Sequence, residues 1–293
     1  ENYKNIYALV EPKEIEEFIN KNNIKFIIHL GAISSTTCYD GNKLWLNNIF
    51  FSSKIWKICC KKNIRLIYAS SAATYGDGKK GFIDKEDLSY LNSLVPLNIY
   101  GWTKNEIDKR IIFSDKFLNI KPPQWVGLKF FNVYGPNEFH KNNMKSIVLK
   151  IYEQIMRNET SYLFKSHNPN YQDGEQKRDF IYVTDIANAF YKAAVSKNKS
   201  DIYNLGTGQP KNIRYLASLI SKNVIFIPKR PGEPNSTHAN INKIKKNLLW
   251  RPTTTFEKGV SNMLLDIDKW KDSPLWDKKS IEKATKKWFE YLG

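Results

Sequence analysis

The chain has 293 residues, of which 41% are hydrophobic and 14% aromatic, so it is long enough to bury a substantial core in one large domain or two coupled ones. Its formal net charge is +17, from 46 Lys and Arg against 29 Asp and Glu, but the basic residues are scattered along the chain. This scatter argues against a nucleic-acid partner and is compatible with a basic cleft for a diphosphate ligand.

The composition also bears on compartment and metal content. No segment approaches the roughly 20 apolar residues of a membrane span, and no signal-peptide pattern opens the chain, so we expect no membrane partner. The three cysteines lack metal-ligand spacing, and their odd number predicts no disulfide framework. We therefore expect a cytoplasmic protein without a bound metal.

Predicted strands and helices alternate through the first half of the chain. The strands are expected over residues 6–10, 24–30, 64–69 and 125–131, and the helices over residues 11–22, 42–62 and 100–118. This alternation predicts an α/β fold with a parallel sheet that is covered by helices on both faces.

The second half is less regular. Its strands are expected over residues 162–164, 178–183, 202–205 and 224–227, and its helices over residues 142–157 and 184–197, with two or three more near the C-terminus. Thr184 is predicted to cap the helix that it opens. Residues 165–177 are expected to form a loop.

A Ser-Tyr-Lys pattern supplies the chemistry. The strand over 64–69 leads into Ser70 and Ser71, and Tyr100 precedes Lys104 by four residues, on one face of a helix. The ammonium of Lys104 is therefore expected to lower the pKa of Tyr100 from about 10 toward neutrality. With the Ser71 hydroxyl, this trio suits proton transfer at a carbinol while a dinucleotide takes up hydride. The Tyr-Lys spacing alone would equally fit an ordinary surface helix, but the serine pair at the strand end makes the pattern specific.

A glycine-rich phosphate-binding turn is expected after the first strand of a dinucleotide-binding fold, but none of the 14 glycines lies in such a setting. The first readable strand and helix match the third strand of that fold and the helix after it. We therefore expect about 45 residues to be missing ahead of Glu1, in a fragment of a longer enzyme. The rival interpretation is a protein that has lost cofactor binding.

Residues 68–76 and 100–104 together resemble the extended short-chain dehydrogenase/reductases that act on nucleotide sugars. Within that family, residues 31–37 resemble the Gly-Ala-x-Ser-Ser-Thr-Thr segment of the ADP-glyceromanno-heptose 6-epimerases. Asn47 and Asn48 also fall where that branch has an asparagine that contacts the cofactor. In isolation, residues 31–37 would be an ordinary Ser- and Thr-rich turn.

The resemblance implies a set of site residues. The catalytic residues would be Ser71, Tyr100, Lys104 and Lys141. A bound NADP, with NAD as the alternative, would contact Gly31, Ala32, Asn47, Ala69, Ser70, Tyr100, Lys104 and Val133. A nucleotide-diphosphate sugar would contact Ser34, Ser71, Asn132, Asn143, Phe164, Ser166, Arg178 and Arg230.

Several of these roles have plain structural alternatives. Lys141 stands where the resemblance implies a second base, but an amine needs burial or a neighbouring cation for that role, and Lys141 would otherwise be a surface residue or a phosphate contact. Arg178 would hold the substrate diphosphate through bidentate hydrogen bonds, or else form a structural ion pair with Asp179. The segment over 204–208 is expected to be architectural.

The resemblance implies a Rossmann-type domain over residues 1–140 that lacks its first strands and returns around 178–206. Residues 141–177 and 207–293 would mainly form a smaller substrate-binding domain. The implied function is that of a nucleotide-sugar epimerase of lipopolysaccharide core synthesis, acting as a homo-oligomer. The alternatives are a UDP-hexose 4-epimerase or nucleotide-sugar dehydratase and, in another class, a non-catalytic scaffold subunit.

Overall fold

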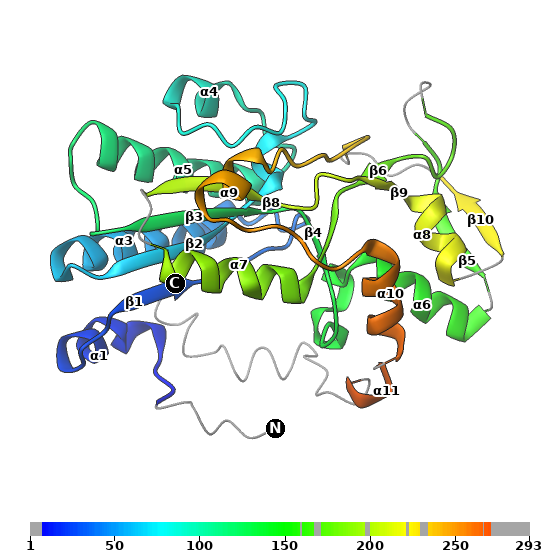
Figure 1. Ribbon diagram of the computed structural model, residues 1–293, viewed down its shortest axis with the longest axis horizontal. Coiled ribbons are helices and arrows are strands. Elements are labelled where there is room, and N and C mark those ends of the chain that lie inside the picture. Colours follow the sequence, from blue (N-terminus) through cyan, green and yellow to red (C-terminus); the bar gives the residue numbers. More distant parts are fainter. Residues whose placement is uncertain are drawn as a thin grey trace.

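A four-stranded parallel sheet lies at the centre of the larger lobe of the molecule (Figure 1). The computed structural model describes residues 8–158, 160–166, 171–196, 200–220, 223–228, 234–265 and 267–270. The sheet has the order β1-β2-β3-β8, and every neighbouring pair is parallel. Its strands are β1 (Phe26–His29), β2 (Arg65–Ser71), β3 (Trp125–Phe130) and β8 (Asp201–Leu205).

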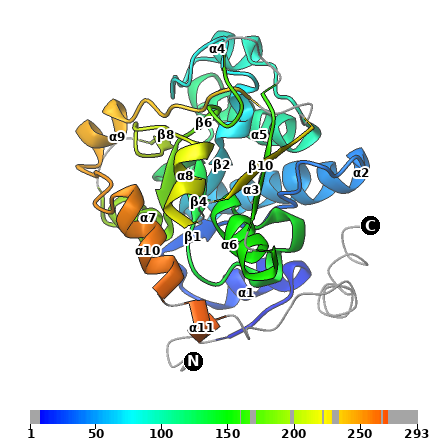
Figure 2. The ribbon, with the colours of Figure 1, turned by 90° about the vertical axis from the view of Figure 1, so that its right-hand side faces the viewer.

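Helices cover both faces of this sheet, which is why its inner strands are apolar almost throughout. The helices α3 (Phe51–Lys62) and α5 (Ile99–Lys116) lie on one face, and α7 (Val183–Val195) lies on the other (Figure 2). The remaining elements of this half are η1 (Pro12–Glu14), α1 (Ile15–Lys21), α2 (Gly41–Leu44), the π-helical η2 (Trp45–Phe50), η3 (Ala72–Tyr75) and α4 (Leu88–Ser93).

The start of α5 is fixed by local chemistry. The Asn98 side chain caps the helix by accepting a hydrogen bond from the Gly101 amide at 2.8 Å, which satisfies one of the free donors of the first turn. Gly101 also permits a close approach to η3, because a Cβ at this position would lie 2.6 Å from the Ala73 carbonyl oxygen. This packing brings the first turn of α5 against the end of β2.

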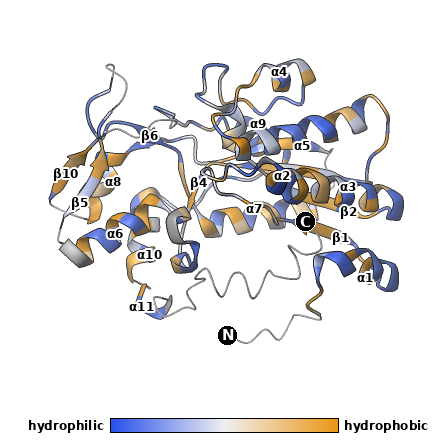
Figure 3. Ribbon diagram, turned by 180° about the vertical axis from the view of Figure 1, so that it is seen from behind, coloured by the Kyte–Doolittle hydropathy of each residue, from blue (hydrophilic) through white to orange (hydrophobic). Residues whose placement is uncertain are grey.

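A second apolar cluster, separate from the core around the sheet, holds the smaller lobe together (Figure 3). Its short sheets pair β4 (Asn132–Tyr134) with β7 (Phe180–Tyr182), β5 (Ser161–Phe164) with β10 (Val224–Ile227), and β6 (Lys177–Arg178) with β9 (Lys211–Asn212). The other elements of this lobe are η4 (Phe139–Met144), α6 (Ile147–Asn158), α8 (Ile213–Ile220), α10 (Phe256–Leu265) and α11 (Ile267–Trp270), whereas α9 (Asn242–Asn247) packs against β8 of the larger lobe.

The predicted α/β fold with a parallel sheet is confirmed, but several local predictions need correction. The strand expected over 178–183 is divided into β6 and β7, and Val183 already belongs to α7. Thr184 does not cap α7, because the helix already begins at Val183 with Tyr182 at its N-cap position. The helix expected from residue 142 begins at Ile147, after the separate 3₁₀ turn η4. Of the strand expected over 6–10, residues 8–10 have no strand structure and the rest lies outside the described residues.

Within the part of the chain that the structure describes, no helix combines the length and apolar character that a membrane crossing requires.

Candidate active site

The carboxyl end of β2 and the first two turns of α5 bring Ser71, Tyr100 and Lys104 together. Ser71 is the last residue of β2 and the N-cap of η3, where its Oγ accepts a hydrogen bond from the Ala73 amide at 3.1 Å. The Ser71 side chain also forms a hydrogen bond with Tyr100. The serine hydroxyl and the phenol therefore already face each other.

Lys104 is buried, and its ammonium donates to the Ala69 carbonyl oxygen at 2.7 Å. Burial disfavours the charged amine and lowers the pKa of Lys104 to about 8, while the carboxylate of Asp108 acts in the opposite direction. Lys104 thus combines a backbone contact at the strand end with titration close to neutral pH.

The predicted lowering of the Tyr100 pKa is wrong in direction. Burial raises the pKa of Tyr100, the hydrogen bond from Ser71 partly offsets this, and the charge of Asp108 adds to the rise. Tyr100 and Lys104 share a helix face, but the Lys104 ammonium is directed at the carbonyl of Ala69. Spacing along a helix fixes which residues are neighbours and leaves the direction of a long side chain open.

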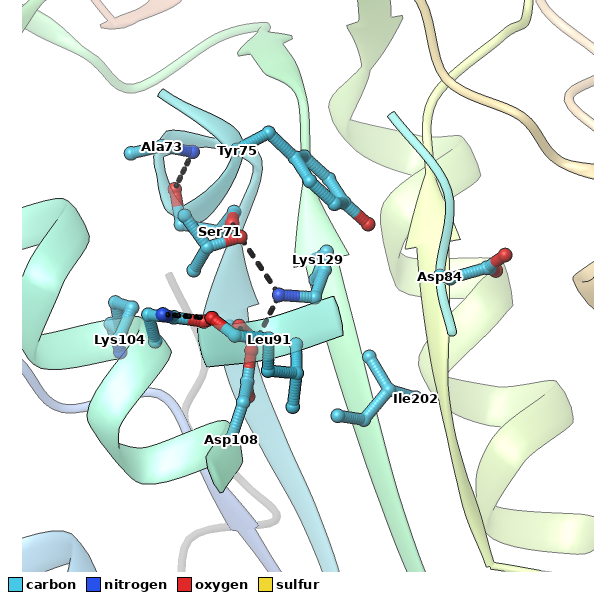
Figure 4. A network of polar contacts seen from close by, with 12 residues as sticks. Ser71, Ala73, Tyr75, Asp84, Leu91, Lys104, Asp108, Lys129 and Ile202 are labelled. Atoms are coloured by element: carbon cyan, nitrogen blue, oxygen red, sulfur yellow. Dashed lines mark hydrogen bonds and ion pairs between the residues drawn. The ribbon is translucent and has the colours of Figure 1, made fainter. Parts of the chain in front are cut away.

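A buried ion pair that the sequence did not reveal lies close to Ser71 and Lys104 (Figure 4). Lys129 of β3 and Asp108 of α5 are both fully buried, with Nζ 2.5 Å from Oδ2. Asp108 follows Lys104 by four residues and therefore shares the face of α5 that carries Tyr100. That spacing was a usable signal for Asp108, but nothing in the sequence pointed to Lys129.

The loop after β1 is fixed to α5 by Asn48. Its Oδ1 accepts from the Ile33 amide at 2.8 Å, and its Nδ2 donates to the Ile33 carbonyl oxygen and to Thr103 Oγ1. Within the same loop, Ser34 is exposed and Ala32 is half-buried. The second asparagine of the pair therefore positions the segment predicted to border the cofactor.

The residues present fit the nicotinamide half of a dinucleotide. Asn47 is buried, and its Oδ1 has no hydrogen-bond partner within the described structure, so a ligand donor can satisfy it. A Cβ on Gly31 would meet nothing nearer than His29 Cε1 at 3.8 Å, which leaves room for a ligand beside the backbone. No run of closely spaced glycines joins a strand to a helix among the residues described, so these residues supply no pyrophosphate cradle of the expected kind.

The predicted residues after β3 lie in β4. The Asn132 amide donates to the Asp179 carbonyl oxygen at 3.0 Å, and Asn132 Oδ1 accepts from Thr237 Oγ1 at 3.1 Å. Val133 is the central residue of β4 and is half-buried. Because β3 neighbours β2 in the sheet, this segment leaves the sheet beside Ser71.

Lys141 lies in a different environment from Tyr100. It belongs to η4, its side chain is 44% exposed, and its Nζ lies 3.7 Å from Glu138 Oε2. Glu138 is itself buried and accepts from the backbone amides of Gly135 and Ser146. The burial expected for a base at Lys141 is absent, and an anionic neighbour stands where a cation was expected.

Arg178 and Asp179 act through separate partners. Arg178 is buried in β6 and donates to the Lys177 carbonyl oxygen at 3.0 Å. The Asp179 carboxylate accepts from the backbone amides of Thr207, Gly208 and Ala239. These contacts join the segment over 204–208 to the rest of the lobe, as its predicted architectural role requires.

The remaining predicted substrate residues are spread along the smaller lobe. Phe164 ends β5 with 37% of its side chain exposed, and the Ser166 amide donates to Asp173 Oδ1 at 2.8 Å. Figure 1 places β5 at the end of the molecule opposite α3. Arg230 lies outside the described residues, as does the side chain of Asn143. The roles of these four residues stay predictions.

Comparisons with known proteins show the family of this chain. The NAD dependent epimerase/dehydratase family matches residues 6–206. An ADP-L-glycero-D-manno-heptose-6-epimerase of Fusobacterium nucleatum is 37% identical over 276 residues, which cover 87% of this chain and 82% of that protein. One of Nitratidesulfovibrio vulgaris is 39% identical over 198 residues, covering 68% of this chain and 59% of that protein.

A solved structure has a similar overall fold. The crystal structure of an ADP-L-glycero-D-manno-heptose-6-epimerase from Helicobacter pylori superposes with a TM-score of 0.74 at 27% sequence identity. The match covers 90% of this chain and 79% of that one.

Proposed function

Because the chain belongs to the NAD dependent epimerase/dehydratase family and is a nucleotide-sugar epimerase, an isomerase, we propose that its substrate is an ADP-glyceromanno-heptose. Under this proposal it inverts one carbinol of the heptose for the lipopolysaccharide inner core. The observation that carries the epimerase chemistry is the meeting of Ser71, Tyr100 and Lys104 at the end of β2, and the 37% identity to an ADP-L-glycero-D-manno-heptose-6-epimerase supports the choice of substrate.

The trio accounts for proton handling at one face of the sugar. A nicotinamide dinucleotide, when bound, accepts hydride from the carbinol and returns it, so that no external oxidant is needed. Tyr100 exchanges the carbinol proton, and Ser71 holds the same oxygen through its hydroxyl. Lys104 places a positive charge beside them and binds the end of β2.

We propose NADP as the cofactor, with NAD as the alternative. Its nicotinamide half would be held by Tyr100, Lys104, the loop at Gly31 and Ala32, the amide oxygen of Asn47, the strand end at Ala69 and Ser70, and the backbone of Val133. The unpartnered Asn47 Oδ1 and the open space at Gly31 support this placement.

Lys141 is our proposal for the group that exchanges a proton at the opposite face of the sugar. Its exposed amine is free to approach a bound ligand, and the buried Glu138 holds the backbone of η4 in place. A substrate that displaces water around Lys141 would supply the burial that the amine lacks in this structure.

The smaller lobe, built from residues 141–177 and from 207 onward, is proposed as the substrate-binding domain beside a Rossmann-type domain. Ser34, Asn132 and Asn143 would face the sugar. Phe164 and Ser166 would flank the nucleotide, and Arg178 and Arg230 would hold the diphosphate. The buried position of Arg178 supports this role, because a guanidinium taken out of water binds a phosphate strongly.

The assignment is tested by substrate choice. The protein is incubated with NADP or NAD and with ADP-glyceromanno-heptose, UDP-glucose or UDP-galactose, and the epimers are separated by anion-exchange chromatography. We expect turnover of the ADP-heptose. Turnover of a UDP-hexose without turnover of the ADP-heptose would establish the 4-epimerase alternative.

We also propose that the protein is cytoplasmic and forms a homo-oligomer. Trp45 and Trp102 stack on each other between η2 and α5 and are about two-fifths exposed, with Arg110 above the Trp45 ring. Exposed aromatic groups of this kind are enriched in protein interfaces. Sedimentation velocity of the protein and of a Trp102→Glu variant tests the oligomer, which the substitution should dissociate.

A further inference from the structure

Three consecutive residues at the carboxyl end of β2 are each held by a side chain from outside the strand. The contacts are Lys104 Nζ to Ala69 O at 2.7 Å, Ser70 Oγ to Asp108 Oδ2 at 2.7 Å, and Thr74 Oγ1 to Ser71 O at 2.8 Å. Side-chain anchors on successive residues leave the strand end little freedom to shift.

Lys129 joins two of these three anchors. Its Nζ donates to Asp108 Oδ2 at 2.5 Å and to Thr74 Oγ1 at 2.8 Å, and the ring of Tyr75 lies 5.0 Å away (Figure 4). Tyr68 OH also donates to Asp108, at 2.9 Å. A fully buried carboxylate and ammonium therefore connect α5, β2, β3 and η3 behind Ser71.

Stability alone does not account for a pair placed in this way. Removing two charges from water costs several kcal/mol each, and apolar side chains of similar volume often stabilise a core at least as well. What the Asp108–Lys129 pair adds is a fixed geometry for the residues bonded to it, because hydrogen bonds to charged groups are short and geometrically restrictive.

We propose that Asp108 and Lys129 are positioning residues that fix the end of β2, and with it the Ser71 hydroxyl, against the phenol of Tyr100. The inference rests on the proposed function only in taking Ser71 and Tyr100 as the groups that handle the carbinol. Neither Asp108 nor Lys129 needs to touch the substrate, since both act through the strand end.

The pair also sets the charge around the trio. The titratable groups that face it are Tyr68 of β2, Tyr75 of η3, Asp84 in the following loop, Tyr100 and Lys104 of α5, and, through Tyr68, Asp201 of β8. The Asp108 carboxylate raises the pKa of Lys104 against the effect of burial. It therefore helps to keep the ammonium charged near neutral pH.

The test compares Asp108→Asn with Asp115→Asn, a matched change about two turns further along α5. Asp115 is also buried, accepts from Trp125 Nε1 at 2.9 Å and pairs with Lys121, away from the trio. In Asp108→Asn we expect kcat to fall by about 100-fold with little change in KM, because the reacting groups are misplaced while nucleotide contacts remain. Asp115→Asn should retain the kcat of the wild-type protein.

A second readout does not need turnover. The Lys104 side chain is followed by NMR of ¹³Cε-labelled lysine, with its signal assigned by its loss in Lys104→Met. In Asp108→Asn the Lys104 titration should move down from about 8 by about one pH unit, because a negative charge beside the ammonium is gone. Asp115→Asn should leave the Lys104 titration unchanged. A purely structural effect of Asp108 would not move the Lys104 titration either, so the shift in Asp108→Asn separates the two explanations.

The double variant Asp108→Asn/Lys129→Met guards against misfolding, because it leaves no unpaired buried charge. We expect it to unfold near the wild-type temperature and to remain slow. A double variant with wild-type kcat, or an unmoved Lys104 titration in Asp108→Asn, would overturn this inference. A wild-type protein that epimerises no nucleotide sugar would overturn the proposed function instead, and the Lys104 titration would still decide the role of Asp108.

Discussion

The two groups proposed to exchange protons, Tyr100 and Lys141, lie in opposite kinds of surroundings. Tyr100 is in the first turn of an 18-residue helix, packed against a strand end and hydrogen-bonded to Ser71. Lys141 is in a short 3₁₀ turn, 44% exposed, with one anionic neighbour at 3.7 Å. The fold itself fixes the surroundings of Tyr100, whereas the surroundings of Lys141 depend on the ligand that binds beside it.

The difference shows which interactions hold each of the two side chains in place. At Tyr100, partial burial and the hydrogen bond with Ser71 act together with the side-chain anchors on the end of β2, so small changes in packing should be costly. At Lys141 a single exposed ion pair acts, and such pairs are worth little free energy in water. Steric changes near Tyr100 should therefore lower the activity. At Lys141, the activity should depend chiefly on the presence of the amine.

The largest effect is expected from Tyr100→Phe, which removes the phenol and leaves the ring. We expect kcat with ADP-glyceromanno-heptose to fall by about 1,000-fold, because general acid–base catalysis contributes that order of rate. Tyr90→Phe is the control, since the hydrogen bonds of Tyr90 OH within the described structure are to backbone: it donates to the Gly81 carbonyl oxygen at 2.8 Å and accepts from the Ile83 amide at 3.4 Å. Equal activities of the two variants would remove Tyr100 from the chemistry.

Lys141→Met tests the exposed face. We expect kcat to fall by about 100-fold at nearly constant KM if the amine exchanges a proton. A rise in KM alone would instead make Lys141 a phosphate contact. Lys145→Met is the matched control, because Lys145 pairs with Glu153 at 2.6 Å a turn further along the chain.

Gly101→Ala tests the packing of the buried face. The new Cβ would lie 2.6 Å from the Ala73 carbonyl oxygen, so α5 must move away from η3, at a cost of about 2 kcal/mol in the free energy of unfolding. Gly41→Ala is the control, because nothing lies within 4 Å of a Cβ there. Urea denaturation measures both, and equal midpoints would show that the contact between α5 and η3 yields easily.

The smallest effect concerns acid stability at the rim of the buried face. Burial lowers the pKa of His29 from 6.5 to about 4, with the charge of Lys104 adding to the shift. The unfolded chain then binds more protons between pH 6.5 and 4, so the free energy of unfolding should fall as the pH drops through that window.

His29→Gln should flatten this part of the stability profile, whereas His238→Gln, at an exposed position, should not. Thermal unfolding between pH 4 and 7 measures both variants. An unchanged slope in His29→Gln would show that His29 is not charged on unfolding in this range.

The order of strands and helices could be predicted because hydrophobic periodicity is a local property of the chain. The strand over 224–227 was predicted with the bounds that β10 has. The misplaced start of α6 and the misassigned cap at Thr184 have one cause. Both lie where the chain leaves regular structure, and there the tertiary contacts decide the ends of helices.

For the site, the sequence by itself determined that Ser71, Tyr100 and Lys104 belong together, since a strand end and a four-residue helical spacing are short-range relations. Only the tertiary structure decided that Lys104 points at Ala69, that burial raises the pKa of Tyr100, and that Lys129 stands behind them. Lys129 meets Thr74 across 55 residues of chain. Desolvation and through-space charge depend on which distant segments pack together, and a local pattern carries no record of that.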